Sequence, residues 1–411
     1  MKWQSAIPHS VVLVLALCGV TLSAQPSGTG TTTRIQNAVI AASCSQAHVS
    51  AAIASATDGD TVLVPAGTCE WSTYVSISDA IHIRGASAAS TTISVSTPDT
   101  TVIYIASDDA EISHLTLSGG ARVQVSSGND WRIHDMVFTS ASASFTALFV
   151  RSTGTSSQSR GLIDSSTFLN GRILVHGYPG VGTGDLTGTT HWSSALGLGT
   201  NEAVYVEDNT FTFTEFYNVF DCEYSGRIVF RHNTVTDSYL ETHSVQGHIR
   251  ACRKWEVYEN TIQQVTDSVY RPMFFRAGTG VIYSNTVTGT YGVGTIHFDN
   301  VRTHTDVGGE VGQCDGTSNW DGNDDASGYP CRDQIGRGVD ASSWPASAPY
   351  PDQTLDPAYI WDNTLNGSPL GVTVINGSET DHIKPNRDYY VNVGAKPGYT
   401  AYTYPHPRRT P

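Results

Sequence analysis

A six-residue phrase recurs along the chain at nearly constant intervals, and it constrains the fold more than any other feature. An apolar residue is followed by two variable residues, then by Asn, Thr and a second apolar residue. The phrase reads VEDNTF, FRHNTV, VYENTI, IYSNTV and IWDNTL, and its asparagines are Asn209, Asn233, Asn260, Asn285 and Asn363. The first four asparagines are 24, 27 and 25 residues apart, so each interval holds one small structural unit.

Three weaker copies, ISHLTL, IHDMVF and IDSSTF, precede these five. Three positions before the Asn or its equivalent, the eight copies carry Ile112, Ile133, Ile163, Val206, Phe230, Val257, Ile282 and Ile360. Two positions after it they carry Leu117, Phe138, Phe168, Phe211, Val235, Ile262, Val287 and Leu365. Two apolar columns flanking a polar bend indicate short strands that turn sharply and bury the same face.

One such unit cannot close a core alone, so the units must stack, with the asparagines forming a ladder of amide hydrogen bonds at the bend. The sequence therefore predicts an all-β chain, folded as a single-stranded parallel β-helix. β-Propeller blades need roughly 40 to 50 residues, and the frame of leucine-rich repeats is missing. We expect a signal peptide over residues 1–24, a linker and capping helix over 25–60, the β-helix over 61–302, a disulfide-tied loop over 303–358, and a last turn with a C-terminal cap over 359–411.

Residues 47–71, AHVSAAIASATDGDTVLVPAGTCEW, contain a short helical segment, then Asp58-Gly59-Asp60, a strand, and Pro65-Ala66-Gly67-Thr68. In this the chain resembles the pectate-lyase-like family of right-handed parallel β-helices. The corresponding element of that family caps the open end of the stack and hides its edge hydrogen bonds. The resemblance covers most of residues 35–300. It implies the fold more than the chemistry, because this fold houses lyases, hydrolases, isomerases, adhesins and phage spikes.

The N-terminal residues predict export. Lys2 precedes an apolar run over residues 11–20 that ends in small residues, as in a cleavable secretory signal. The run is too short for a membrane span, so we expect a secreted protein with no membrane partner. Removal of Cys18 leaves six cysteines for an oxidising compartment. We expect the two shortest loops, Cys44 with Cys69 and Cys314 with Cys331, and then Cys222 with Cys252 as the remaining pair.

The net charge is -15 and the isoelectric point is near 5.2. Nucleic acids select a basic face, so this charge argues against a nucleic-acid partner. The expected partner is a polysaccharide, and the expected state is a monomer.

Alignment of the strands on the asparagines predicts where outward side chains meet. Asp221 and Glu223 lie 12 and 14 residues after Asn209, and His297 and Asp299 lie 12 and 14 residues after Asn285. Counting back from the following asparagine places Glu223, Arg250 and Arg276 at offsets of 10, 10 and 9. We therefore expect a solvent-facing row of Glu223, Arg250, Arg276 and Asp299, beside a second row of Asp221, His248, Phe274 and His297. The expected walls of this groove are Tyr217, Glu241, His243, Arg271 and Arg302.

Acids, arginines and histidines in one row suit β-elimination from a uronic-acid polysaccharide. Arg250 and Arg276 would neutralise the substrate carboxylate, and His248 or His297 would act as the base. The family resemblance implies a calcium-dependent variant, in which Asp221, Glu223 and Asp299 would hold the ion.

Two other functions remain open at this point. Asp221 and Glu223 could serve an inverting glycoside hydrolase, whose carboxyl groups stand roughly 6.5 to 9.5 Å apart. Alternatively, the row is a ladder of ion pairs on a non-catalytic glycan-binding or structural surface protein.

The segment CDGTSNWDGNDDASGYPC, between Cys314 and Cys331, offers a second candidate for calcium. Its ligands would be Asp321, Asn323 and Asp325. The spacing matches no EF-hand and lacks the closing Glu, so an ordinary solvated loop is the competing interpretation.

Overall fold

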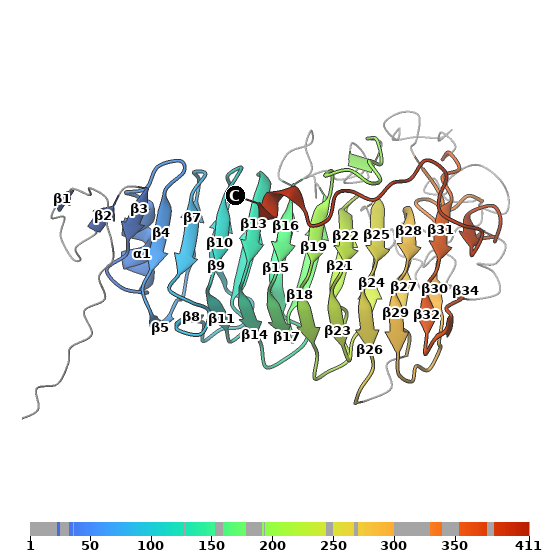
Figure 1. Ribbon diagram of the computed structural model, residues 1–411, viewed down its shortest axis with the longest axis horizontal. Helices are drawn as coiled ribbons and strands as arrows, with labels where there is room; N and C mark the ends of the chain where they lie inside the picture. The colour runs from blue at the N-terminus through green and yellow to red at the C-terminus, as the bar shows by residue number, and fades with distance from the viewer. Residues whose placement is uncertain are drawn as a thin grey trace, which may run out of the picture.

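The computed structural model describes residues 23–24, 33–35, 37–126, 128–152, 159–177, 191–192, 194–243, 250–266, 270–299, 329–338, 353–375 and 382–410. Short strands stack side by side along one long axis, with the helix α1 (Gln46–Ile53) at the N-terminal end (Figure 1). The described strands form four sheets, in which nearly all pairs are parallel.

The two largest sheets run almost the whole length of the molecule. The first contains, in spatial order, β1 (Ser23–Ala24), β2 (Thr33–Ile35), β3 (Ala38–Ile40), β4 (Thr61–Val64), β7 (His82–Gly85), β10 (Glu111–Ser113), β13 (Asn129–His134), β16 (Arg160–Asp164), β19 (Val204–Glu207), β22 (Arg227–Arg231), β25 (Lys254–Tyr258), β28 (Thr279–Tyr283), β31 (Ala358–Trp361) and β35 (Tyr389–Val391). The second contains β5 (Gly67–Glu70), β8 (Thr91–Ser94), β11 (Thr116–Ser118), β14 (Val137–Thr139), β17 (Thr167–Leu169), β20 (Thr210–Thr212), β23 (Thr234–Thr236), β26 (Thr261–Gln263), β29 (Thr286–Thr288), β32 (Thr364–Leu365) and β33 (Ser368–Pro369).

The other two sheets follow one another along the axis. The third contains β6 (Val75–Ile77), β9 (Thr101–Ile105), β12 (Arg122–Val125), β15 (Thr146–Arg151), β18 (Arg172–His176) and β21 (Phe220–Glu223). The fourth contains β24 (Leu240–Glu241), β27 (Met273–Phe275), β30 (Ile296–Phe298) and β34 (Val372–Val374).

The chain visits these sheets in a repeating order. After β7 in the first sheet come β8 in the second and β9 in the third, and the next cycle is β10, β11 and β12. Because β10 pairs in parallel with both β7 and β13, consecutive cycles lie directly on one another. The chain is therefore all-β with long parallel sheets, which is consistent with the parallel β-helix predicted from the repeat.

The two apolar columns predicted from the repeat are present. Each residue of the first column pairs with its counterpart in the next turn, from Ile112 through to Ile360. The second column is continuous in the same way from Leu117 to Leu365. Apart from the partly buried Leu365, the members of both columns are buried in one contiguous core, so burial of apolar surface drives the stacking.

The asparagine ladder is also confirmed. The Asn233 backbone N–H donates to Asn260 Oδ1 at 2.9 Å, and the Asn260 N–H donates to Asn285 Oδ1 at 3.1 Å. The residue before each asparagine has a positive φ, for example 55° at His232 and 56° at Glu259. Such a bend breaks the regular backbone pairing, and the asparagine amides satisfy the groups that it leaves.

The N-terminal cap is tied to the first turns. Ser45 caps the start of α1, whose Val49 and Ala52 are buried against the core. The predicted disulfide between Cys44 and Cys69 is present. Trp71 Nε1 donates to the carbonyl of Cys44 at 2.9 Å. The helix therefore covers the end of the stack, as a buried sheet end requires.

The remaining cysteine predictions have different outcomes. Cys222 forms a disulfide with Cys252. Cys331 is disulfide-bonded, and its expected partner Cys314 lies outside the described residues. Residues 1–22 of the predicted signal peptide, which spans residues 1–24, also lie outside them. Within the described part of the chain, no helix is long and apolar enough to cross a membrane.

The C-terminal tail runs back along the first sheet from β31 toward β16 (Figure 1). Tyr399 donates to Glu256 Oε2 at 2.7 Å, and the backbone N–H of His406 donates to Glu207 Oε1 at 2.9 Å. Arg231 donates to the carbonyl of Tyr402 at 2.7 Å. These buried charged groups therefore find their partners in the tail, which holds it across several turns.

Candidate functional site

The third and fourth sheets meet at β21 and β24, and the candidate site lies at this junction. The His243 N–H donates to the carbonyl of Cys222 at 3.0 Å, and the Val219 N–H donates to that of Tyr239 at 2.9 Å. These bonds carry the parallel stacking across the junction. Outer side chains of β21, β24, β27 and β30 consequently form rows that cross from one sheet to the other.

Strand pairing defines two outer rows of four residues each. Glu241 pairs with Phe274, which pairs with His297. The bond from His243 to the Cys222 carbonyl aligns His243 with Glu223, and the Asp299 N–H donates to the Phe275 carbonyl at 3.0 Å, which aligns Asp299 with Arg276. Glu241, Phe274 and His297 thus form the first row, and counting two residues back from Glu223 and His243 adds Asp221 to it. The second row is Glu223, His243, Arg276 and Asp299.

The prediction that Arg250 occupies the second row is wrong, because His243 stands in its place. Arg250 is fully buried, and its NH2 lies 2.5 Å from Asp333 Oδ1. Its guanidinium also stacks over the ring of Trp192, 4.5 Å from the centroid. Its carbonyl accepts from the Tyr224 N–H at 2.8 Å, which places the residue beyond the end of β21. Arg250 is therefore part of a buried ion pair that joins this turn to the segment around Asp333.

Glu241 stands where the sequence register put His248. His248 itself lies outside the described residues, as do Arg302 and the loop residues Asp321, Asn323 and Asp325. The expectation of a solvent-facing row also needs correction. Asp221, His297 and Asp299 expose only 7%, 2% and 3% of their surface. The row lies on the outer side of the sheets but is largely covered, which strengthens its electrostatic interactions.

His243 is the centre of the charged cluster. Its Nδ1 lies 3.3 Å from Asp221 Oδ2 and 3.1 Å from Glu223 Oε1. Arg276 NH2 lies 2.9 Å from the same nitrogen. The Nε2 of His243 has no hydrogen-bond partner among the described residues and is not enclosed by them. One ring nitrogen is therefore held by the protein, while the other remains open to a ligand.

Glu241 and Arg276 form the second part of the cluster. Arg276 NH2 lies 2.7 Å from Glu241 Oε1. Glu241 Oε2 accepts from Asn218 Nδ2 at 2.8 Å and from the Tyr239 hydroxyl at 3.1 Å. Because both oxygens are satisfied, Glu241 is fixed in place and holds Arg276 beside His243.

Arg271 differs from its neighbours, because among the described residues no carboxylate lies within 4.0 Å of its guanidinium. Its NH1 lies 3.1 Å from His297 Nδ1, and its guanidinium stacks 3.7 Å from the centroid of the Phe274 ring. Arg276 approaches the same ring at 5.1 Å. Burial lowers the pKa of Arg271. The arginine thus carries a charge that is oriented by His297 and Phe274 and that no described carboxylate contacts directly.

The environment shifts the pKa values of the two carboxyl groups of β21, Asp221 and Glu223, in opposite directions. Burial raises the pKa of Glu223, and the charge of Asp221 adds to this rise although His243 and Arg276 oppose it. Burial also favours the neutral form of Asp221, but the hydrogen bond and charge of His243 outweigh it and lower the pKa. Paired carboxyl groups with diverging pKa values are typical of acid–base sites.

The pKa values of His243 and His297 are shifted in opposite directions as well. Burial opposes the charged form of His243, yet its hydrogen bond to Asp221 raises its pKa above 6.5. Burial and the charge of Arg271 lower the pKa of His297 to about 4. His243 therefore keeps its proton to a higher pH than an ordinary imidazole does, and His297 is neutral at neutral pH.

The calcium set implied by the family resemblance does not fit these positions. Glu223 and Asp299 are separated by His243 and Arg276, three strand spacings or about 14 Å apart. Asp221, Glu223 and His243 do lie within 4.8 Å of one another. Arg276, however, already supplies positive charge at 2.9 Å from the His243 nitrogen. The cluster is thus a carboxylate–imidazole–guanidinium group.

The sequence analysis missed several neighbours of the cluster. His176 pairs with Glu223 in the strand register, and its Nε2 lies 3.7 Å from Glu223 Oε2. Arg172 stacks over the ring of Tyr217 at 4.9 Å. This turn carries Ser166 in place of the anchor asparagine, since the Ser166 N–H donates to Asn209 Oδ1. Counting from asparagines therefore omitted it.

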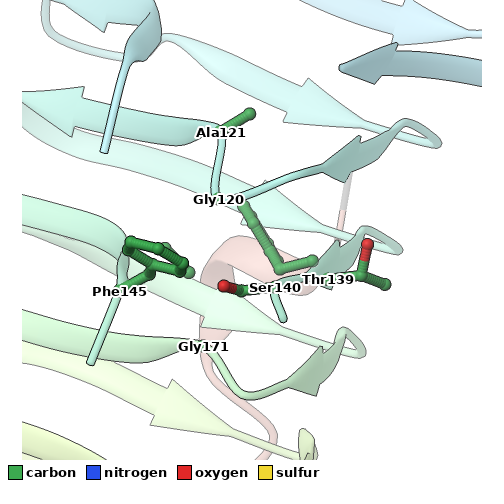
Figure 2. Close-up of a pocket in the computed structure, with 8 residues that line it drawn as sticks. Gly120, Ala121, Thr139, Ser140, Phe145 and Gly171 are labelled. Carbon is green, nitrogen blue, oxygen red and sulfur yellow. The ribbon is translucent and has the colours of Figure 1, made fainter. Parts of the chain in front are cut away.

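Two surface depressions lie away from this cluster. One is small and is lined by Gly120, Ala121, Phe138, Thr139, Ser140, Phe145, Ala147 and Gly171, without any titratable side chain. Figure 2 shows Gly120, Ser140 and Phe145 around it. The other lies near Asn363 and Asn392, and Asp362 is the single titratable residue in its lining. Neither offers a pair of groups for proton transfer.

Comparison of the chain with protein-family models, with curated proteins and with solved structures found no match.

Proposed function

We propose that this protein is a secreted polysaccharide lyase that cleaves a uronic-acid-containing glycan by β-elimination at the rows joining β21, β24, β27 and β30. We further propose that its scaffold is a right-handed parallel β-helix of the pectate-lyase-like kind. Strand order, the asparagine ladder and the capping helix support the scaffold. The two disulfides fit an oxidising compartment.

One observation carries the function. Arg271 is an oriented cation without a carboxylate partner among the described residues, and it stacks on Phe274, the ring that Arg276 of the charged cluster also approaches. An arginine holds a carboxylate through two parallel hydrogen bonds. Neutralising a uronate carboxylate makes the hydrogen on the adjacent carbon acidic, which is the requirement of β-elimination.

Proton transfer is assigned to Glu223 and His243. Glu223 has a raised pKa and, once ionised, accepts the proton from the carbon beside the substrate carboxylate. The electron pair of that C–H bond forms the new carbon–carbon double bond, and the glycosidic C–O bond breaks. Protonated His243, held through Nδ1, donates the Nε2 proton to the departing oxygen.

Exposed aromatic rings flank the rows and suit the faces of sugar rings. Phe216 is 55% exposed and stacks on Tyr239, with ring centroids 4.8 Å apart. Tyr270 is 53% exposed and lies under the guanidinium of Arg271, at 4.9 Å. These rings mark the rim on which a glycan would lie.

Glycoside hydrolysis is the second candidate, favoured by the diverging pKa values of Asp221 and Glu223. Carboxylate oxygens of the two residues lie within 4.8 Å of each other. An inverting enzyme needs roughly 6.5 to 9.5 Å between its carboxyl groups to admit a water molecule, so this spacing does not support the inverting hydrolase. A non-catalytic glycan-binding protein is the third candidate.

A single screen separates the three candidates. Polygalacturonate, alginate and a glucuronan are incubated with the protein, and both ultraviolet absorbance of unsaturated uronates and reducing ends are followed. Elimination raises both signals, hydrolysis raises reducing ends alone, and a binding protein raises neither. The last two results would overturn the proposal.

Arg271→Ala tests the observation on which the proposal rests. The variant should lose about 100-fold to 1,000-fold in kcat/KM, as for loss of one electrostatic stabiliser. Arg151→Ala is the matched control, because Arg151 lies on the same outer face and, among the described residues, its guanidinium contacts Ser126 and Phe149 rather than the cluster. If Arg271→Ala is as active as Arg151→Ala, Arg271 does not neutralise the substrate carboxylate.

A further inference from the structure

A second cluster of ligand-type side chains lies on the first sheet, far from the rows described above. His82 on β7, Glu111 on β10 and His134 on β13 come from three successive turns. One nitrogen of each imidazole and one carboxylate oxygen all lie within 4.8 Å of one another. The stacking of parallel turns thus places two imidazoles and one carboxylate around a single point.

The contacts of His134 are those of a metal ligand with its supporting carboxylate. Its Nδ1 lies 2.6 Å from Asp135 Oδ2, and its Nε2 lies 2.5 Å from Glu111 Oε1. A metal-binding histidine commonly donates its second nitrogen to a carboxylate, which fixes the ring and raises its basicity. Asp135 is in this position, so Nε2 is the nitrogen directed at the ion.

The surroundings of the cluster favour a cation. Arg132 NH1 lies 3.8 Å from Glu111 Oε1, while the other two guanidinium nitrogens of Arg132 donate to Asp164 at 2.9 and 3.0 Å. The guanidinium of Arg132 is therefore directed mainly at Asp164, whereas in the other cluster Arg276 contacts the imidazole directly. A third imidazole, His114, lies edge-on to His134 with centroids 6.0 Å apart. Its Nδ1 is enclosed and has no partner among the described residues.

We propose that His82, Glu111 and His134 form a binding site for Zn²⁺ or a chemically similar divalent transition-metal ion, with Asp135 as the supporting carboxylate. Nitrogen and carboxylate ligands in a 2:1 ratio suit Zn²⁺. Around a tetrahedral ion with bonds of about 2.0 to 2.2 Å, ligand atoms stand about 3.3 to 3.6 Å apart. Small side-chain rotations bring the three atoms to this spacing, and the fourth position is left to water or an external ligand.

The competing interpretation is a metal-free bridge in which a protonated His134 pairs with Glu111 and Asp135. Titration calorimetry with ZnCl₂ on the full-length protein, carrying no polyhistidine tag, separates the two. The proposal expects one equivalent of Zn²⁺ to bind, and Co²⁺ to give visible absorption bands of a site with nitrogen and oxygen ligands. Failure of the wild-type protein to bind either ion would overturn it.

Variants locate the site. His134→Ala and Glu111→Gln should each abolish the binding, and Asp135→Asn should weaken it about 10-fold to 100-fold, as for a supporting carboxylate. His232→Ala is the matched control, because His232 is likewise paired with a carboxylate, that of Glu259. His243→Ala tests the other cluster. Binding that survives in His134→Ala and Glu111→Gln, or that disappears in His243→Ala, would overturn the assignment.

Discussion

Cys252 is bonded to Cys222, the residue that separates the two carboxylates Asp221 and Glu223 on β21. Asp221 and Glu223 point outward from this strand, while Cys222 points into the core. The bond closes a loop of 30 residues that contains Glu241 and His243. One covalent link therefore anchors the strand that carries the carboxylates to the segment that carries their partners.

Replacing both Cys222 and Cys252 with Ala should reduce both stability and activity. The loop length corresponds to about 3 to 4 kcal/mol of unfolding free energy. Activity should fall at temperatures where the variant is still folded, because β24 has lost its anchor. Urea unfolding and the elimination assay measure the two effects.

The control for this prediction is the double variant with Cys44 and Cys69 changed to Ala. That disulfide closes a loop of similar length, 25 residues, in the N-terminal cap. It should cost a similar amount of stability and leave activity in the folded protein unchanged. If both double variants lose activity in parallel, the Cys222–Cys252 bond has no special part in the site.

Arg250→Met should destabilise the fold by about 3 to 5 kcal/mol, because it leaves the carboxylate of Asp333 buried without its partner. Adding Asp333→Asn should recover part of this loss, since an amide oxygen can still accept from the Ala251 N–H. Arg151→Ala, a half-exposed control, should change stability by no more than about 0.5 kcal/mol. Urea unfolding is compared for the wild type, Arg250→Met, Arg250→Met with Asp333→Asn, and Arg151→Ala. An unchanged stability of Arg250→Met would contradict the buried ion pair.

The contrast between Arg250 and His243 shows what periodicity can and cannot predict. Interior columns repeat in every turn because each strand buries the same face, so the sequence was sufficient to align Val206 with Phe230. The outer rows depend on where extra residues are inserted. In the 27-residue turn before Asn260, the extra residues lie after β24. Counting back from Asn260 assumed instead that the extra residues lie before β24, which placed Arg250 where His243 stands. The pairing of Arg250 with Asp333, 83 residues away, has no local signal.

Asn260→Ala should cost about 3 kcal/mol or more of unfolding free energy. The side-chain Oδ1 of Asn260 accepts from the Asn233 backbone N–H, and its side-chain Nδ2 donates to the backbone carbonyls of Phe230 and Tyr258. Each buried group left unsatisfied costs about 1 to 3 kcal/mol. Gln263→Ala on the neighbouring strand removes one partly buried bond to Thr236 and should cost less than about 1.5 kcal/mol. Thermal and urea unfolding measure the loss of stability in each variant. If Asn260→Ala and Gln263→Ala lose the same amount, the ladder adds nothing beyond ordinary hydrogen bonds.

The activity of the protein should follow a bell-shaped dependence on pH that identifies the roles of Glu223 and His243. The base must be ionised, so activity rises as pH passes the raised pKa of Glu223, above its ordinary 4.5. The acid must be protonated, so activity falls as pH passes the raised pKa of His243, above its ordinary 6.5. The maximum of kcat/KM therefore lies between these two limits.

Two variants test the assignment separately. His243→Gln should lower kcat by about 100-fold to 10,000-fold, as for loss of a general acid, and should abolish the descending limb. Glu223→Gln should lower activity similarly and abolish the ascending limb. His297→Gln is the control, because His297 is neutral across this range and its loss should leave both limbs in place. A descending limb that persists in His243→Gln would assign the acid to another group, and an ascending limb that persists in Glu223→Gln would do the same for the base.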